Sequence, residues 1–463
     1  MADFEKNLSE GSVVKNLILF ALPVLGSNFI QSIYTFVGMF VVGRFAGAAA
    51  MSGVTIGGQT TFILTQMIIG LCMGTSIVIG QYVGSGNHEA LKKVTATIIT
   101  LLLILSVVIT AVSLVFADQI LDLIRTPVES YKDSRDYLIV TLVGMIFIFG
   151  YNAFAAILRG MGDSRRPFYF VLIASILSII LDFVFIAGMG MAAMGAALSA
   201  VISQAASMIF CIVYMIRHDF SFDFKLSSFR IYKDQLRLIL RFGMPPCIQN
   251  SVTSLSFIFI TAMVNMVGGV NASAAVGAIG RFNGFGFMPV QALSMSVSVM
   301  CAQNFGAGRL DRAVKSCWIG TSMAIVVSYS FFALLQVFPG QIVSIFSSEP
   351  AVIEAGITYI RSFSFEYLFI PFMFCLNGLF MGGGHTTFTL INSILSSVLI
   401  RVPVSYFFGL YMGWGLLGIG MGAPGASVFI MVMIIGFLIS GRWKQNVVRN
   451  AGALMESEPA PAK

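Results

Sequence analysis

Charged side chains are scarce in this sequence. Only 10% of its 463 residues are Asp, Glu, Lys or Arg, whereas 57% are hydrophobic and the mean hydropathy is +0.91. Soluble globular domains carry about 25% charged residues. Disordered chains have low hydrophobicity, and nucleic-acid-binding domains carry dense basic patches. The composition therefore excludes an ordinary soluble domain, a disordered chain and a nucleic-acid-binding protein.

Motifs for catalysis and metal binding are also missing. The six cysteines form no CxxC pair, and no P-loop, HExxH or GxSxG motif stands in a suitable context. Such spacings bring metal ligands, phosphate-binding groups or a nucleophile and its base together. We therefore expect neither an enzyme nor a bound metal or cofactor. A proton or a sodium ion is the simpler energy source.

Long uncharged runs are abundant instead. A helix that crosses a bilayer needs about 20 mostly apolar residues. The runs that meet this need are Asn16–Gly43, Phe45–Asn87, Val94–Ala117, Tyr137–Leu158, Pro167–Ile216 (long enough for two helices), Phe242–Gly280, Phe282–Gly308, Ser316–Ser348, and residues 357–381, 387–410 and 414–440. They predict an all-α, polytopic membrane protein with twelve spans, embedded in the lipid bilayer.

Basic residues are distributed unevenly over these spans. Of the 27 Lys and Arg residues, 20 fall at the termini and in the even-numbered loops, and only four in the odd-numbered loops. Cytoplasmic loops carry the excess of Lys and Arg. We therefore predict that both termini are cytoplasmic and that the protein lies in the cytoplasmic (inner) membrane of a cell.

The chain repeats itself at an offset of 222 residues. Leu22-Pro23 matches Met244-Pro245, the Gln81-x-x-Gly84-x-Gly86 loop matches Gln303-x-x-Gly306-x-Gly308, and Gly160-x-Gly162 matches Gly382-x-Gly384. We predict two pseudo-symmetric six-helix lobes, residues 1–216 and 242–445, with a cytoplasmic linker at 217–241 and a cytoplasmic tail at 446–463. Repeated halves that share an orientation usually rock around a central cavity, which favours a transporter.

Several segments resemble one known family. These are LPVLGSNFIQSIYTFVGMFVVGRF, GQYVGSGN, ILRGMGDSRRP and MGAALSAVISQ in the first half, and GMPPCIQNSV, FMPVQALSMSVSVMCAQNFGAG and RVPVSYFFG in the second. In this order they resemble the multidrug and toxic compound extrusion (MATE) family. The resemblance implies two six-helix lobes around a central cleft. It also implies efflux of small organic, cationic and amphipathic compounds by proton or sodium antiport, and we expect a monomer.

The sequence departs from the family pattern at the ion-coupling positions. Gly38 stands where many members carry Asp, Ser178 stands for a common Asn, and Ala200 beside Ser199 stands for a Thr. Asp182 and Asn152 remain. We predict Asp182 as the proton-coupling acid; sodium coupling would instead require Asn152, Ser178 and Ser199 to complete a site.

Charged residues inside spans are costly and need a partner or a function. Asp182 has no Lys or Arg at its depth in the first half, so burial favours its protonation. Glu366 and Arg401 share a depth in the second half, with Arg281 near the same level. This placement predicts a Glu366–Arg401 ion pair, with a role of Glu366 in transport as the alternative.

Polar side chains recur at helical spacing on two predicted helices. The two stripes are Asn28, Gln31 and Thr35 on the first helix, and Gln249, Thr253 and Ser256 on the seventh. They predict either cavity lining or helix packing. Arg159 and Asp163, four residues apart, suggest a local ion pair or a helix cap, with a cytoplasmic gate as the alternative. A flippase for amphipathic metabolites or lipid-linked substrates, or a channel, remains the alternative function.

Overall fold

The structure is a computed structural model that describes residues 5–218, 220, 222 and 224–448. Its contacts divide the chain into two compact units. Unit 1 contains the stretch up to Asn7 and Leu22–Cys247; unit 2 contains Leu8–Ala21 and the chain from Ile248 onward. The division falls inside helices, after residue 247 and before residue 22, and not at the predicted linker of residues 217–241.

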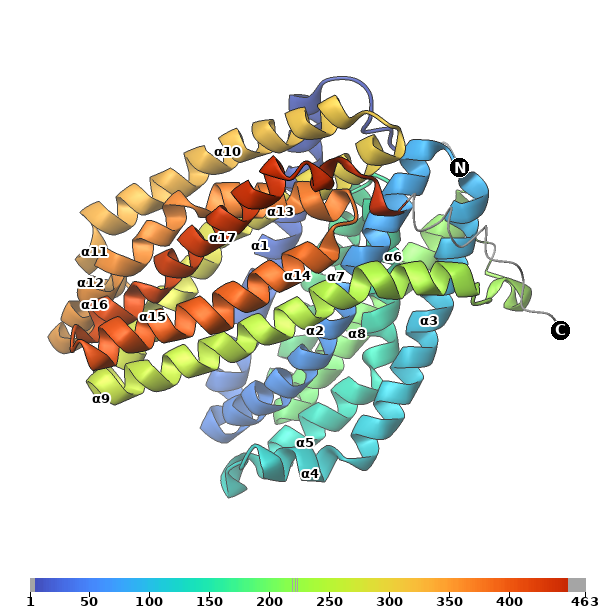
Figure 1. Ribbon diagram of the computed structural model, residues 1–463. Coiled ribbons are helices and arrows are strands. Elements are labelled where there is room, and N and C mark those ends of the chain that lie inside the picture. The colour runs from blue at the N-terminus through green and yellow to red at the C-terminus, as the bar shows by residue number, and fades with distance from the viewer. Residues whose placement is uncertain (1–4, 219, 221, 223, 449–463) are drawn as a thin grey trace. The chain divides into compact units, whose positions relative to one another are not determined.

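Unit 1 is built of helices, which Figure 1 shows in blue to green. The elements are α1 (Val13–Phe45), α2 (Gly47–Ser85), α3 (His88–Val115), the short α4 (Ala117–Leu123), α5 (Val128–Val143), α6 (Met145–Gly160), α7 (Arg165–Asp182) with a π-helical continuation (Phe183–Gly188), and α8 (Ala192–Arg217). The first turns of α1 belong to unit 2. The axes of α5 and α6 meet at 50°, so this pair is one bent span.

Unit 2 repeats this order from the yellow-green α9 to the red α17 (Figure 1). It contains α9 (Lys233–Gly306, whose first turns belong to unit 1), α10 (Leu310–Val337), α11 (Pro339–Ser344), α12 (Pro350–Phe363), a 3-10 segment (Ser364–Leu368), α13 (Ile370–Gly382), α14 (Thr386–Ile394), π-helical segments (Leu395–Arg401 and Phe407–Tyr411) around α15 (Val402–Tyr406), α16 (Gly415–Gly420) and α17 (Gly422–Ile439). The axes of α12 and α13 meet at 42°, matching the bend in unit 1.

The span count agrees with the predicted twelve. In the described chain, nine helices are long and apolar enough to cross a membrane, and the two bent pairs raise this number to eleven. The long α9 consists of two helices joined at Gly269, whose φ of 56° breaks the helix and supplies the twelfth span. The uncharged runs Phe242–Gly280 and Phe282–Gly308 did not locate this boundary, since Arg281 between them lies inside a span.

The sequence repeat is visible in the backbone. α3 and α10 begin at residues 88 and 310 and end at 115 and 337, so both ends differ by 222. Left-handed glycines recur at the same offset, as the pairs Gly47 and Gly269, Gly86 and Gly308, and Gly162 and Gly384. Beyond them the offset becomes 223, since Gly190 corresponds to Gly413. The two units therefore fold by one plan, and unit 2 contains one extra residue between Gly384 and Gly413.

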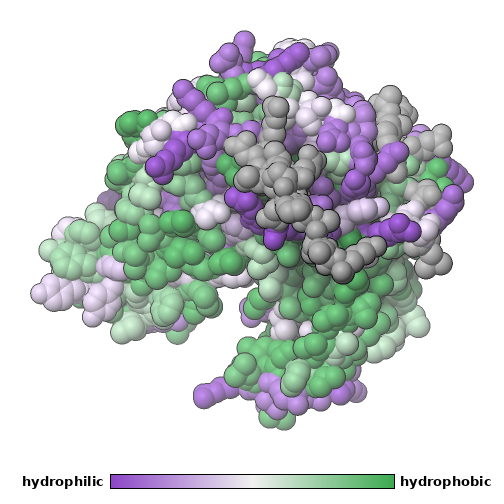
Figure 2. Space-filling model, turned by 45° about the vertical axis from the view of Figure 1, so that its right-hand side comes forward, coloured by the Kyte–Doolittle hydropathy of each residue, from purple (hydrophilic) through white to green (hydrophobic). Residues whose placement is uncertain are grey.

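The surface is suited to a lipid environment. Many large apolar side chains are exposed along the long helices, for example Phe36 (74%) on α1 and Val326 (68%) on α10. Figure 2 shows broad hydrophobic stretches over the helices, with hydrophilic side chains gathered toward helix ends. This arrangement is the reverse of a soluble protein, whose exposed apolar patches are small. The chain is a multi-pass membrane protein.

Candidate functional site

A buried carboxylate ends helix α7 in unit 1. Asp182 is only 4% exposed, and the hydroxyl of Ser199 on α8 donates a hydrogen bond to its Oδ1 atom. Asp182 and Ser199 meet because α7 and α8 are consecutive helices that pack against each other along the chain turn at residues 189–191. The described part of the chain places no Lys or Arg within ion-pair distance of Asp182.

The backbone of α1 also lies against the Asp182 carboxylate. A Cβ atom placed on Gly38 would lie 3.0 Å from Asp182 Oδ2. The position where many family members carry Asp therefore faces Asp182 directly. With glycine there, unit 1 offers one carboxylate at this point instead of two.

A polar cavity of about 30 Å³ lies one helical turn away from Asp182. Its polar lining includes Gln31, Tyr34, Ser175, Ser178, Ser203 and Gln204. Ser178 precedes Asp182 by four residues and Ser203 follows Ser199 by four, so both lie one turn along their helices from the carboxylate. This volume holds a few water molecules and is far smaller than a site for a drug-sized ligand.

The other predicted coupling residues, Asn152 and Ser178, make no hydrogen bond to Asp182 in the described chain. Ser178 is buried and lines the cavity. The amide nitrogen of Asn152 on α6 donates to the carbonyl oxygen of Ile148 at 2.8 Å, within its own helix. Of the predicted set, only Ser199 has a hydrogen bond to Asp182 in the described chain.

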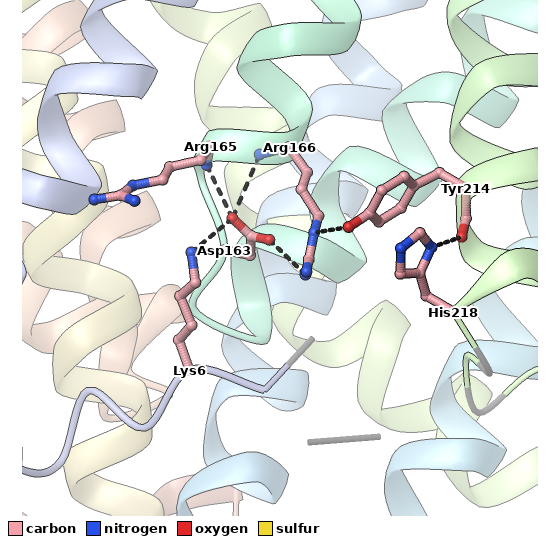
Figure 3. Close-up of polar contacts among 6 residues, drawn as sticks. All are labelled: Lys6, Asp163, Arg165, Arg166, Tyr214 and His218. Atoms are coloured by element: carbon pink, nitrogen blue, oxygen red, sulfur yellow. Dashed lines mark hydrogen bonds and ion pairs between the residues drawn. The ribbon is translucent and has the colours of Figure 1, made fainter. Parts of the chain in front are cut away.

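Asp163 caps helix α7 and joins three segments of unit 1 (Figure 3). Its Oδ1 atom accepts hydrogen bonds from the backbone N–H groups of Arg165 (3.0 Å) and Arg166 (3.4 Å). Lys6 Nζ lies 3.2 Å from Oδ1, and Arg166 Nη1 lies 2.8 Å from Oδ2. The guanidinium of Arg166 also donates to the hydroxyl of Tyr214 on α8 at 3.0 Å. This cluster ties the N-terminal segment to the α6–α7 loop.

The predicted ion pair of Asp163 with Arg159 is wrong, whereas the predicted helix cap is present. The partners of Asp163 are Lys6 and Arg166 instead. In the described chain, Arg159 Nε is buried without a hydrogen-bond partner, near Tyr151 and Cys72. The four-residue spacing misled the prediction because α6 ends at Gly160, so residue 163 no longer follows the helical path.

His385 occupies the position of Asp163 in unit 2. Its Nε2 atom lies 3.1 Å from the carbonyl oxygen of Trp443 and 3.0 Å from that of Gln445. Because carbonyl oxygens only accept, Nε2 carries the proton. We predicted a tail from residue 446; residues 446–448 are ordered against unit 2, where the N–H of Val447 donates to Gly383, and the remainder lies outside the described residues.

Glu366 and Arg401 do not form the predicted ion pair in the described chain, although they are near enough for the charge of Arg401 to act on Glu366. Within the described chain, no ion pair joins these two side chains, and Glu366 Oε2 is buried without a hydrogen-bond partner. The guanidinium of Arg401 lies over the ring of Phe257, 4.5 Å from its centroid. Arg281 is exposed. Equal depth put Glu366 near Arg401 but could not give the direction of each side chain around its helix.

The two predicted polar stripes differ in what their side chains contact. Gln31 lines the cavity in unit 1, while Asn28 is half-buried and Thr35 is exposed, with its hydroxyl bonded to Gln31 O. In unit 2, Ser256 is buried and donates to the carbonyl oxygen of Ser397 at 2.9 Å, which is a packing role. The hydroxyl of Thr253 bonds to the carbonyl oxygen of half-buried Gln249.

Sequence reasoning missed most of the cavity. It did not single out Tyr34, Tyr151, Ser175, Ser203 and Gln204, all of which line it. A signal was available: serines recur every four residues on α8, at 199, 203 and 207. Such a stripe marks one face of a helix.

One family model matches the chain twice. The model described as MatE covers residues 23–184 and 245–407. The matches start 222 residues apart and end 223 apart, in agreement with the repeat seen in the backbone. The chain therefore belongs to the MATE family, whose members are membrane transporters and not enzymes.

Individual relatives agree with this assignment. The "Probable multidrug resistance protein YoeA" of Bacillus subtilis is 31% identical over 436 residues, covering 93% of this chain and 94% of the relative. The "Probable multidrug resistance protein NorM" of Thermotoga maritima is 25% identical and covers 94% of each. A crystal structure of MATE in complex with MaD3S has the same fold, with a TM-score of 0.87 at 23% identity, covering 97% of this chain and 99% of that one.

Proposed function

We propose that this protein is a secondary active exporter of small organic, cationic and amphipathic compounds, which it exchanges for protons. The observation that carries the proposal is the buried Asp182, hydrogen-bonded to Ser199 and without a basic partner in the described chain. A carboxylate held inside a membrane is costly when it is charged and alone. A proton or a cationic substrate can each relieve that cost, and competition between them for one carboxylate gives antiport.

The relatives support the substrate class. The B. subtilis and T. maritima relatives are named as multidrug resistance proteins. The composition supports a pliable apolar binding surface, since the chain contains 26 Met and 42 Phe residues. Flexible Met-rich surfaces can repack around different ligands.

Protons are favoured over sodium by the surroundings of Asp182. A sodium site needs several oxygen atoms that converge on one point. Here Gly38 supplies no side chain, and Ser199 is the one predicted ligand with a hydrogen bond to Asp182 in the described chain. We also propose that the protein acts as a monomer in the cytoplasmic membrane, with both termini and residues 217–241 on the cytoplasmic side, as the distribution of Lys and Arg favours.

The change Asp182→Asn tests the coupling residue. Asparagine is permanently neutral, so we expect gradient-driven efflux from proteoliposomes to be abolished while expression and thermal stability stay close to wild type. Glu366→Gln is the matched control, since it neutralises another buried acid, and it should retain proton-driven efflux. Proton and sodium gradients are imposed separately. Wild-type efflux by Asp182→Asn, or efflux driven by sodium alone, would refute the proposal.

Export of an amphipathic metabolite is the second candidate. One relative, from Shewanella oneidensis, is named "FAD transporter" and is 26% identical over 317 residues, covering 66% of this chain and 69% of the relative. Its name favours a bulky, anionic substrate. Competition assays with FAD and with a cationic dye, in the same proteoliposomes, distinguish the two substrate classes.

A further inference from the structure

A line of hydroxyl groups continues from Asp182 along the α7–α8 interface of unit 1. Ser199 contacts the carboxylate, Ser203 follows one turn later, and Ser207 follows after another turn, where its hydroxyl donates to the carbonyl oxygen of Phe170 at 2.8 Å. On α7, Ser178 and Ser175 line the same cavity as Ser203. At 1.5 Å per residue, this polar line extends about 12 Å from the carboxylate along α8.

Several oxygen atoms in this cavity need partners. In the described chain, Ser175 Oγ, Ser203 Oγ and Gln204 Oε1 are buried without a hydrogen-bond partner, although all three residues line the cavity. Ser175 and Ser203 are each only 3% exposed. Buried polar groups in native proteins are almost always satisfied by protein or by ordered water. A polar cavity of this size satisfies such groups with water.

The second unit lacks a carboxylate at the position of Asp182. A Cβ atom on Gly422 would lie against Ser405 Oγ, as Ser199 lies against Asp182, so Ser405 stands at the position of Asp182 and Gly422 at that of Ser199, both at an offset of 223. Ala426 and Ile430 replace Ser203 and Ser207 at the same offset, while Ser427 stands for Gln204. The serine line along α8 is therefore not repeated at these positions of unit 2, which links it to the carboxylate of unit 1.

We propose that the cavity between α7 and α8 is a hydrated proton path, in which water held by Ser175, Ser203 and Gln204 carries the proton to and from Asp182. The inference rests on the proposed role of Asp182 in coupling. When the Asp182 carboxyl group releases its proton, the neighbouring hydroxyl or water accepts it and passes one of its own protons onward. The relay groups end unchanged, and the net result is one carboxylate and one proton at the far end of the cavity.

The far end of this path lies at Tyr151. This residue lines the cavity, and its hydroxyl donates to the carbonyl oxygen of Pro167 in the first turn of α7, at 3.1 Å. The first turn of α7 is also the turn that Asp163 caps. The path thus leads from Asp182 toward the α6–α7 loop.

Water in the cavity is tested directly by radiolytic hydroxyl-radical footprinting of the full-length protein. Radicals formed from bound water modify the side chains that contact it. We expect Tyr151, which is 5% exposed, to be modified much faster than the fully buried Tyr367 of unit 2. The double variant Ser175→Ala/Ser203→Ala should reduce that modification. Equal protection of Tyr151 and Tyr367 would mean a dry cavity and would overturn the proposal.

The relay itself is tested by proton-driven efflux from proteoliposomes. Ser203→Ala should lower the maximal rate severalfold with an unchanged KM for a cationic dye, and Ser203→Thr, which keeps a hydroxyl, should restore it. Ser427→Ala is the matched control, because this buried serine of unit 2 bonds to its own helix through Ala423 O.

The outcomes separate the two proposals. If the double variant Ser175→Ala/Ser203→Ala transports at the wild-type rate while Asp182→Asn is inactive, the proton path is wrong and the coupling role of Asp182 stands. If Asp182→Asn is itself active, both proposals fail. A rate loss equal in Ser203→Ala and Ser427→Ala would indicate a general packing defect and would also overturn the path.

Discussion

Asp163 and His385 occupy equivalent positions of the two units and hold equivalent contacts with different side-chain chemistry. Both follow a glycine in the left-handed conformation, Gly162 and Gly384, at the start of a helix. In unit 1 the N–H of Lys6 donates to Met161 O, and in unit 2 the N–H of Val447 donates to Gly383 O, 222 residues further on. Each loop therefore holds one end of the chain, through a carboxylate in unit 1 and an imidazole in unit 2.

The imidazole should make this contact sensitive to pH. Burial lowers the pKa of His385 below the ordinary value of 6.5, although its hydrogen bonds to the carbonyl groups of Gln445 and Trp443 oppose the shift. Between the lowered pKa and about pH 6.5, the folded state binds fewer protons than the unfolded state. Stability contributed by this group is therefore present above that window and is lost as the pH falls through it.

We expect the thermal unfolding midpoint of the purified wild type to decrease when the pH is lowered from 7.5 to 5.5. The decrease should be smaller in His385→Gln. Glutamine can still donate a hydrogen bond to the carbonyl groups but does not titrate. Parallel pH profiles of the two proteins would contradict this expectation.

At the scale of secondary-structure elements, the 222-residue repeat locates helix boundaries better than hydropathy does. Hydropathy did not locate the break between the first two helices of unit 2, because the uncharged runs Phe242–Gly280 and Phe282–Gly308 are separated only by Arg281, which we placed inside a span. The structure places it at Gly269, the repeat partner of Gly47, which lies between α1 and α2. Both glycines have positive φ, a conformation that glycine adopts without steric cost. Following the repeat through Gly47 would have located the break from the sequence.

At the start of α8, a residue other than glycine has the left-handed conformation that its repeat partner reaches with glycine. Ala192 has a φ of 46°, whereas its repeat partner Gly415 has a φ of 61°. The left-handed conformation costs a non-glycine residue about 1 kcal/mol. Unit 1 thus carries local strain where unit 2 has none.

Ala192→Gly should therefore raise the unfolding free energy by up to about 1 kcal/mol, which thermal unfolding in detergent measures. Gly415→Ala should have the opposite effect through the backbone alone, since its new Cβ would meet only Val267 at an ordinary 3.5 Å. Ala193→Gly, one residue further into the helix, is the control and should destabilise. A loss of stability in Ala192→Gly equal to that in Ala193→Gly would show that the strain is absent.

At the scale of the whole molecule, the fold was predictable and the contacts were not. Twelve spans, two related halves and the family follow from uncharged runs and from matched segments, because lipid imposes its composition on every span. The Glu366–Arg401 and Arg159–Asp163 pairs failed for another reason. Sequence spacing gives the depth of a side chain but neither its direction around the helix nor the helix end, and both decide which atoms meet.

The asymmetry between the units bears on the number of protons moved. Unit 1 holds Asp182, whereas unit 2 has Ser405 at the corresponding place. With Gly38 in place of a second acid, the coupling site we propose releases a single proton in each cycle. Exchange of one proton for one monovalent cation moves no net charge across the membrane.

We therefore expect efflux of a monovalent cationic dye from proteoliposomes to follow the pH gradient and to be independent of an imposed potassium-diffusion potential. Each net charge moved would add about 2.3 kcal/mol per 100 mV, so a two-proton cycle would accelerate strongly when the potential favours proton entry. A neutral dye provides the internal comparison, because one proton then moves uncompensated and its efflux should respond to the potential. If the cationic dye responds and Glu366→Gln removes the response, Glu366 carries a second proton and the single-acid account is wrong.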